Sequence, residues 1–163
     1  MPTSVNTKAC RRRLVAFASL DDIAADLDQI ETSHRAGSLK RLGNHEPGPI
    51  CQHLAMAMQR SFDGFPIRVN PLLRVLGRAL KKRELSRPFQ PGFRLNAKAE
   101  SFAWDVATTF EIGITNLRAQ IVRAKAPGAA PNGAHPFFGP MSPAEWQIYY
   151  LRHAELHLSF LQP

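Results

Sequence analysis

Two histidines, His153 and His157, stand four residues apart near the C-terminal end of the sequence. If this segment is helical, both imidazoles lie on one face, one turn apart. Such a pair can chelate a single metal ion, and a third ligand is needed to hold the ion firmly. The spacing therefore indicates metal chemistry. Six histidines in 163 residues also allow such a pair to arise by chance, with no role.

The third ligand that we expect is His53, which lies between Ile50 and Leu54 on or near the core side of another amphipathic segment. The C-terminal pair itself belongs to an apolar stripe, where an unpartnered polar ring would be costly. Imidazole ligands suit several divalent ions, of which zinc and nickel are our first expectations. Three protein ligands leave a coordination position open, so a bound water or thiol would have a lowered pKa.

Two further side chains are candidates for catalytic roles at such a centre. Tyr149 lies one helical turn before His153, and His135 lies in the preceding loop. Each is placed to donate a hydrogen bond to a substrate or to support a ligand. The alternative is that Tyr149 is a core aromatic residue and that His135 packs within its loop.

Two other residues near the histidines are not expected to join them. Glu155 follows His153 by two positions, about 200° around a helix, so the zinc-protease motif is absent and metalloprotease chemistry is disfavoured. Cys51 lies two residues before His53 and so roughly on the opposite side of its helix. We expect a buried structural thiol there.

Hydrophobic periodicity predicts that helices position these residues. Ser19 to Asp22 resembles a capping box that opens a helix over about 20–33, and Ser142 to Glu145 opens another that extends to about Leu161. The remaining helices are expected from about Ile50 to Asp63, from Pro71 on the surface, and along one continuous stripe from Phe102 to Ile121. No strand pattern is evident. The fold class predicted is therefore all-α, a four-helix bundle with a long crossover between its second and third helices.

Composition is typical of one folded domain over 1–163, which we expect to have a short flexible N-terminus at about 1–12. No segment is apolar enough to insert across a membrane, and two cysteines without CxxC spacing agree with a cytoplasmic location. The formal charge is +8, and residues 68–98, hereafter the basic segment, hold nine basic residues and one acid. Bundles of this size often pair through a helix face, so a homodimer is an open expectation.

The basic segment supports a rival hypothesis, in which a bundle without enzymatic activity binds nucleic acid or an anionic surface. Only two aromatic residues, Phe89 and Phe93, lie within it, and no nucleic-acid motif is recognisable. A solvated basic face or a lid over the histidines is the simpler account, so nucleic acid is disfavoured as a partner and a small-molecule substrate is preferred.

Several longer motifs carry a resemblance over almost the whole chain. They are Ile50-Cys51-Gln52-His53-Leu54-Ala55, the loop His135-Pro136-Phe137-Phe138-Gly139-Pro140, and Arg152-His153-Ala154-Glu155-Leu156-His157. With Arg12-Arg13-Leu14 and Ser61-Phe62-Asp63-Gly64-Phe65-Pro66, the sequence resembles the DinB/YfiT-like superfamily, and within it the branch known as domain of unknown function 1569.

This resemblance implies a four-helix bundle that holds one divalent metal through three histidines, which correspond to His53, His153 and His157. Superfamily members of known activity use a low-molecular-weight thiol, as transferases or as a thiol-dependent isomerase. The implied function is a metal-dependent and thiol-dependent transferase or hydrolase acting on a small molecule. The chain departs from the branch at Asn44-His45-Glu46, where Asn-Trp-Ser is usual, so the entry loop is expected to differ. His45 is either a polar group at the site or an exposed loop residue.

Overall fold

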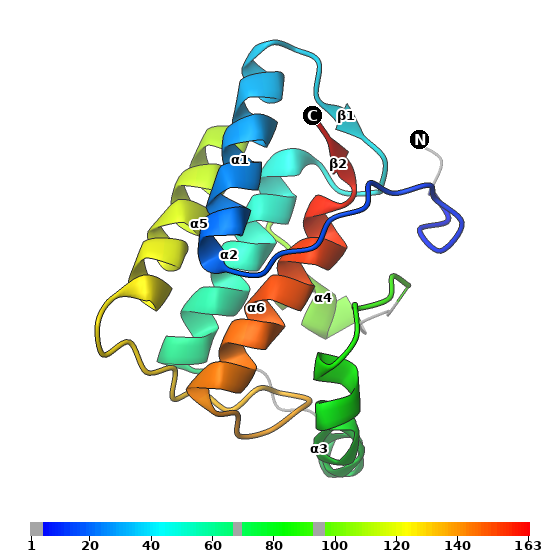
Figure 1. Cartoon of the computed structure of the whole chain (residues 1–163). Helices are drawn as coiled ribbons and strands as arrows, with labels where there is room; N and C mark the ends of the chain where they lie inside the picture. Colours follow the sequence, from blue (N-terminus) through cyan, green and yellow to red (C-terminus); the bar gives the residue numbers. More distant parts are fainter. Residues whose placement is uncertain (1–4, 67–69, 93–96) are drawn as a thin grey trace.

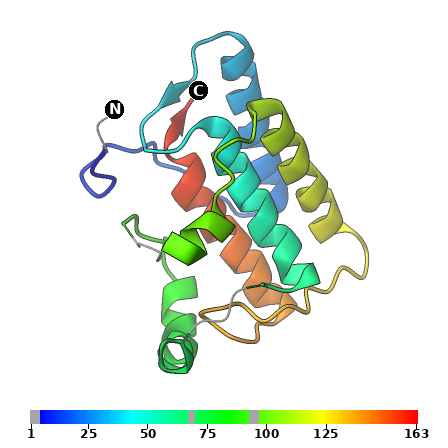
Figure 2. The same cartoon turned by 180° about the vertical axis from the view of Figure 1, so that it is seen from behind.

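The computed structural model describes residues 5–66, 70–92 and 97–163, and within them an antiparallel helical bundle dominates (Figures 1 and 2). The four bundle helices lie side by side, and two more helices belong to the crossover. The predicted all-α fold is confirmed. In chain order the elements are α1 (Leu20–Arg35), β1 (Lys40–Arg41), α2 (Pro47–Asp63), α3 (Pro71–Leu85), α4 (Ala97–Ala103), α5 (Phe110–Lys125), α6 (Pro143–Leu158) and β2 (Leu161–Gln162).

Two capping boxes fix where α1 and α6 begin, as the sequence predicts. The Ser19 hydroxyl accepts from the Asp22 backbone N–H, and the Asp22 carboxylate accepts from the Ser19 N–H. Ser142 and Glu145 make the same reciprocal pair at α6. Each box satisfies N–H groups that the first helical turn leaves without partners. The start of α6 therefore sets which of its side chains face the core.

The core lies between the four bundle helices, and α2 packs most closely against α5. A Cβ on Gly113 would lie 2.3 Å from the Gly48 carbonyl oxygen, so only glycine permits this approach. Burying a large aliphatic side chain stabilises the fold by about 1.5–3 kcal/mol. Side chains that are almost wholly buried come from all four helices and include Ile23, Leu27, Ile30, Cys51, Leu117, Trp146 and Leu158.

The stripe that was expected to form one helix from Phe102 to Ile121 is broken, and this expectation is wrong. The helix α4 ends at Ala103, and α5 begins at Phe110. Thr109 caps α5, because its hydroxyl accepts a hydrogen bond from the Ile112 N–H. Between them, the Asp105 carboxylate accepts from the Ala107 N–H and holds a turn. These side chains compete with helical hydrogen bonding. The crossover therefore bends across the face of the bundle.

The C-terminal end of the chain also differs from expectation. The helix α6 stops at Leu158 rather than near Leu161, because the following residues pair with β1. The Leu42 N–H donates to the Phe160 carbonyl oxygen, and Leu161 is fully buried. The prediction of no strands is therefore wrong, because the described residues include the short strands β1 and β2.

The N-terminal segment runs along α6 and ties it to α1 (Figure 1). The guanidinium of Arg13 makes a two-point ion pair with the buried carboxylate of Asp26, and its Nε donates to the Leu161 carbonyl oxygen. Part of the expected flexible terminus, residues 1–4, lies outside the described residues, as do residues 68, 69 and 93–96 of the basic segment.

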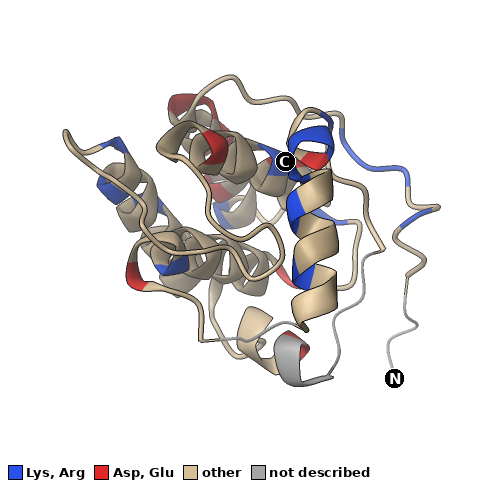
Figure 3. Ribbon diagram, turned by 90° about the horizontal axis from the view of Figure 1, so that it is seen from below, with Lys and Arg blue, Asp and Glu red and all other residues tan. Residues whose placement is uncertain are grey.

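The helix α3 stands apart from the bundle at the end where α6 begins (Figure 1). Its cap is Asn70, whose side-chain oxygen accepts from the Leu72 N–H. The prediction of a surface helix that starts at Pro71 is confirmed. In Figure 3, basic positions recur along this helix. No helix in the described ranges is long and apolar enough to cross a bilayer.

Candidate metal centre

The structure brings together the three histidines that the sequence singles out. His53 comes from the middle of α2, and His153 and His157 come from successive turns of α6. One ring nitrogen from each lies within 4.8 Å of the others, and the Nε2 atoms of His53 and His153 are 3.0 Å apart. Residues 100 positions apart in the chain thus point their imidazoles at one place.

A backbone carbonyl fixes the orientation of His53. Its Nδ1 lies 2.7 Å from the Ala103 oxygen, which can only accept, so Nδ1 carries the hydrogen and donates it. Nε2 then presents its lone pair to the other two rings. Metal-binding histidines usually donate their second ring N–H in this way, which fixes the tautomer and makes the ligating nitrogen more basic.

Burial keeps the three rings in the neutral form that binds a metal. It lowers the pKa of His53 to about 4, and the hydrogen bond to Ala103 opposes this shift in part. The pKa values of His153 and His157 are lowered well below the usual value, first by burial and then by the neighbouring imidazoles. Near neutral pH the cluster is therefore uncharged and needs to lose no proton before it binds a cation.

The donor set fits a divalent ion on two counts. Tetrahedral ligands about 2.05 Å from zinc lie about 3.3 Å from each other. The three ring nitrogens lie within 4.8 Å of one another, so they are near enough to share one ion. Among the described residues, neither nitrogen of His157 has a hydrogen-bond partner. His153 is buried, whereas His53 and His157 are partly exposed, so one side of the cluster remains accessible.

An aromatic cover lies over the cluster, and sequence reasoning missed it. The Trp104 ring stacks on His53 with centroids 4.2 Å apart and meets His157 edge to face. His45 stacks on the other side of Trp104 at 3.5 Å and is partly buried, so it is not an exposed loop residue. The helix break after Ala103 places this cover. Asp105 and Thr109, both typical of turns and helix caps, were the signals that could have revealed it.

Tyr149 and His135 lie beside the cluster, on the side toward the start of α6. The Tyr149 ring is 5.1 Å from that of His153 and 4.9 Å from that of His135. Burial raises the pKa of Tyr149, so its hydroxyl remains a donor. Nδ1 of His135 accepts from the backbone N–H groups of Phe137 and Phe138, which places its hydrogen on Nε2. Burial lowers the pKa of His135 to about 3.

Glu155 and Cys51 both lie away from the cluster, as expected. The Glu155 carboxylate is buried and accepts from the Phe17 N–H and from Arg152. Cys51 is fully buried against α5, and burial raises the pKa of its thiol to about 12. A protonated thiol in an apolar contact is a poor nucleophile and a poor metal ligand.

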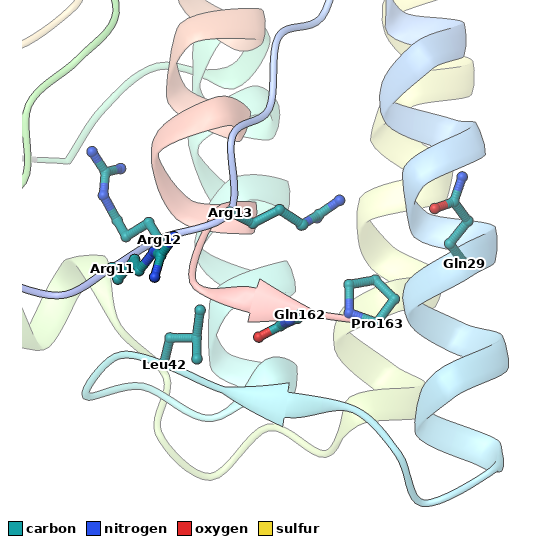
Figure 4. A pocket seen from close by; sticks show the side chains of 7 residues that line it. All are labelled: Arg11, Arg12, Arg13, Gln29, Leu42, Gln162 and Pro163. Atoms are coloured by element: carbon teal, nitrogen blue, oxygen red, sulfur yellow. The ribbon is translucent and has the colours of Figure 1, made fainter.

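A cavity of about 610 Å³ lies elsewhere, between the N-terminal segment and the β1–β2 pair (Figure 4). The three histidines are not among the residues that line it. Arg13 extends toward α1 in Figure 4, in keeping with its pairing to Asp26, and Arg12 donates to the Ser159 hydroxyl. The lining residues are Arg11, Arg12, Arg13, Gln29, Leu42, Gln162 and Pro163.

Comparisons with known proteins give a family for this chain. No curated protein and no solved structure matches the chain. One family model does match, described as "Protein of unknown function (DUF1569)", over residues 9–163. That range contains all three histidines and the loop at 135–140. The chain therefore belongs to the DUF1569 family.

Proposed function

We propose that the protein binds one divalent metal, zinc or nickel, through His53, His153 and His157, and acts as a metal-dependent and thiol-dependent transferase or hydrolase on a small molecule. The observation that carries the proposal is the convergence of three neutral imidazoles, one of them held by the Ala103 carbonyl. Membership of a DinB/YfiT-like superfamily, suggested by the sequence motifs, supports the use of a thiol by analogy.

A divalent ion with three histidine ligands would lower the pKa of a water or thiol in its open position and so supply a nucleophile near neutral pH. The chain's own residues prepare the site for this. Trp104 shields one side of His53 from water, which strengthens electrostatic interactions there. The accessible edge beside His53 and His157 is where a small substrate would enter.

We assign Tyr149 and His135 donor roles at the inner end of the site, beside the buried His153. The Tyr149 hydroxyl, kept protonated by burial, would donate to a substrate oxygen next to His153. His135 has Nδ1 occupied by two backbone N–H groups, so only its Nε2–H can act toward Tyr149 or a substrate. Its role is that of a donor and not of a base.

The alternative function is a bundle without enzymatic activity whose basic segment binds nucleic acid or an anionic surface. That account makes no use of the histidine cluster, in which one ring nitrogen from each of three histidines faces the others. We therefore place metal chemistry first.

Cobalt substitution tests the proposal. Untagged protein is loaded with Co²⁺ and titrated with a low-molecular-weight thiol, and the visible and near-ultraviolet spectra are recorded. We expect tetrahedral Co²⁺ bands and a new thiolate-to-cobalt charge-transfer band at saturation. The matched variants are His153→Ala, which should show neither feature, and His34→Ala, which removes a histidine outside the cluster and should show both. Cobalt bands that do not respond to thiol would contradict the thiol-dependent reaction and leave a metal site alone.

A further inference from the structure

The helix α3 presents its apolar side chains to solvent. The exposed fractions are 76% for Leu72, 48% for Leu73, 65% for Val75 and 50% for Leu76. Leu72, Val75 and Leu76 follow one another at helical spacing, so they form a continuous apolar face. Contiguous exposed apolar surface on an otherwise packed protein usually marks an interaction site. We call Leu72, Leu73, Val75 and Leu76 the apolar face of α3.

Contacts on the other side of α3 hold this orientation in place. A Cβ on Gly77 would lie 2.2 Å from the Phe137 carbonyl oxygen, so the helix lies directly against the loop at 135–140. Lys81 pairs with Glu145 at 2.8 Å and also donates to the Pro140 carbonyl oxygen. Turning the apolar face inward would break these contacts. Its exposure is therefore built into the fold.

The helix α3 also carries exposed cations, one of which, Arg78, packs its stem against Gly139 in the loop at 135–140. Arg74, Arg78, Lys82 and Arg83 are all exposed, and within the described part of the chain none of them forms an ion pair. The one acid of α3, Glu84, is paired with Arg87. An exposed amphipathic helix with a leucine-rich face and an excess of positive charge has the character of helices that lie at a lipid–water interface.

We infer that α3 docks the protein onto an anionic phospholipid surface, with the helix parallel to the membrane plane. Leu72, Val75 and Leu76 would enter the boundary between headgroups and acyl chains, and the exposed cations would contact lipid phosphates. This docking is peripheral and requires no helix that crosses the bilayer. It does not depend on the metal centre.

Charge argues against a second copy of the chain as the occupant. In a two-fold symmetric dimer the same patch meets itself, so the exposed cations beside the apolar face, Lys82 and Arg83, would approach those of the other copy. The apolar face argues against nucleic acid, since phosphates need cations but not exposed leucines, and α3 carries no aromatic side chain on which a base could stack. A lipid surface satisfies both features together.

Vesicle cosedimentation tests the inference with variants that leave net charge unchanged. The full chain is mixed with vesicles of phosphatidylcholine alone or with about one-third phosphatidylglycerol, at about 0.15 M salt. The test variant is Leu72→Ser with Leu76→Ser. The matched control is Ile112→Ser with Val122→Ser on α5, where both side chains are also exposed, by 54% and 70%.

We expect the wild type and the control to bind the anionic vesicles and not the neutral ones, and the test variant to bind about ten-fold more weakly or worse. Equal binding of the test variant would overturn the inference, because adsorption by net charge alone would then explain the result. Absence of binding to anionic vesicles would also overturn it. So would a dimer in sedimentation velocity that the test variant dissociates, or tighter binding of a DNA duplex that the serine substitutions leave intact.

Discussion

The three-histidine cluster and the single histidine His135 differ in how their ring nitrogens are partnered. His135 is enclosed and its pKa is lowered to about 3, and His53 is enclosed with its pKa lowered to about 4. Burial therefore lowers the pKa of both residues to a similar value. Nδ1 of His135 accepts from two backbone N–H groups, whereas Nε2 of His53 faces other imidazoles.

This difference separates a histidine whose lone pair is satisfied by the backbone from one whose lone pair is available to a metal ion. At His135 the loop supplies donors for the lone pair, so the ring is satisfied without a cation. At His53 the backbone supplies an acceptor, the Ala103 carbonyl, which places the hydrogen on Nδ1 and directs the Nε2 lone pair at the neighbouring imidazoles. A lowered pKa alone is therefore a poor guide to metal binding. The identity of the hydrogen-bond partner at each ring nitrogen is the better one.

The largest expected effect is stabilisation by zinc. A free zinc concentration about one hundred times the dissociation constant should stabilise the fold by about 2.7 kcal/mol, because the ion binds the folded chain. For a chain of this size the melting temperature should rise by about 5–10 °C. Differential scanning calorimetry with zinc and with a chelator measures this.

The controls for that shift compare a histidine of the cluster with one outside it. His157→Ala should abolish the zinc-dependent rise in melting temperature, and His34→Ala should keep it. A rise of equal size in His157→Ala would mean that zinc binds somewhere other than the cluster.

A smaller effect is expected from pH, and it concerns His135. Its pKa is about 3 when folded and near 6.5 when unfolded, so the unfolded chain binds more protons between these values. The free energy of unfolding should therefore fall as the pH falls, by about 1.4 kcal/mol per unit below pH 6 from this residue. We expect His135→Gln to show a shallower slope between pH 7 and pH 5 in urea titrations of the metal-free protein. A slope unchanged by the substitution would show that the ring is protonated in the folded state.

The smallest effect is expected at the aromatic cover. Removing the ring in Trp104→Ala takes away its stacking on His53, worth about 0.5–1.5 kcal/mol. Zinc affinity should fall by up to about ten-fold, as measured by competition with a chromophoric chelator. Trp104→Phe is the matched control and should retain most of the affinity. If Trp104→Ala leaves the affinity unchanged, the cover takes no part in holding the cluster.

Local patterns were sufficient to predict which histidines lie together but not what surrounds them. The four-residue spacing of His153 and His157 and the core side of His53 are properties of single helices, which periodicity can predict. The Ala103 carbonyl and Trp104 reach the cluster only because the chain leaves its helix before Asp105. A continuous apolar stripe concealed that break, since Phe102 and Val106 fit the helical period and yet are exposed.

The orientation of α3 could likewise not be predicted from the sequence. Its amphipathic pattern and its start at Pro71 are evident from residue types alone, and an apolar face normally turns toward the core. Here the close contact between Gly77 and the Phe137 carbonyl reverses that rule. This contact joins segments sixty residues apart in the sequence, so it cannot be predicted from the residues near either segment. The β1–β2 pairing of two residues each is a tertiary feature of the same kind.

The most direct test of the metal centre is the number of ions bound per chain in untagged protein, measured by mass spectrometry after incubation with zinc and removal of free ion. We predict about one ion per chain in the wild type and in His135→Gln, and less than about one-tenth in His53→Ala and His153→Ala. Retention of a full ion by His153→Ala, or no ion in the wild type, would contradict the three-histidine site.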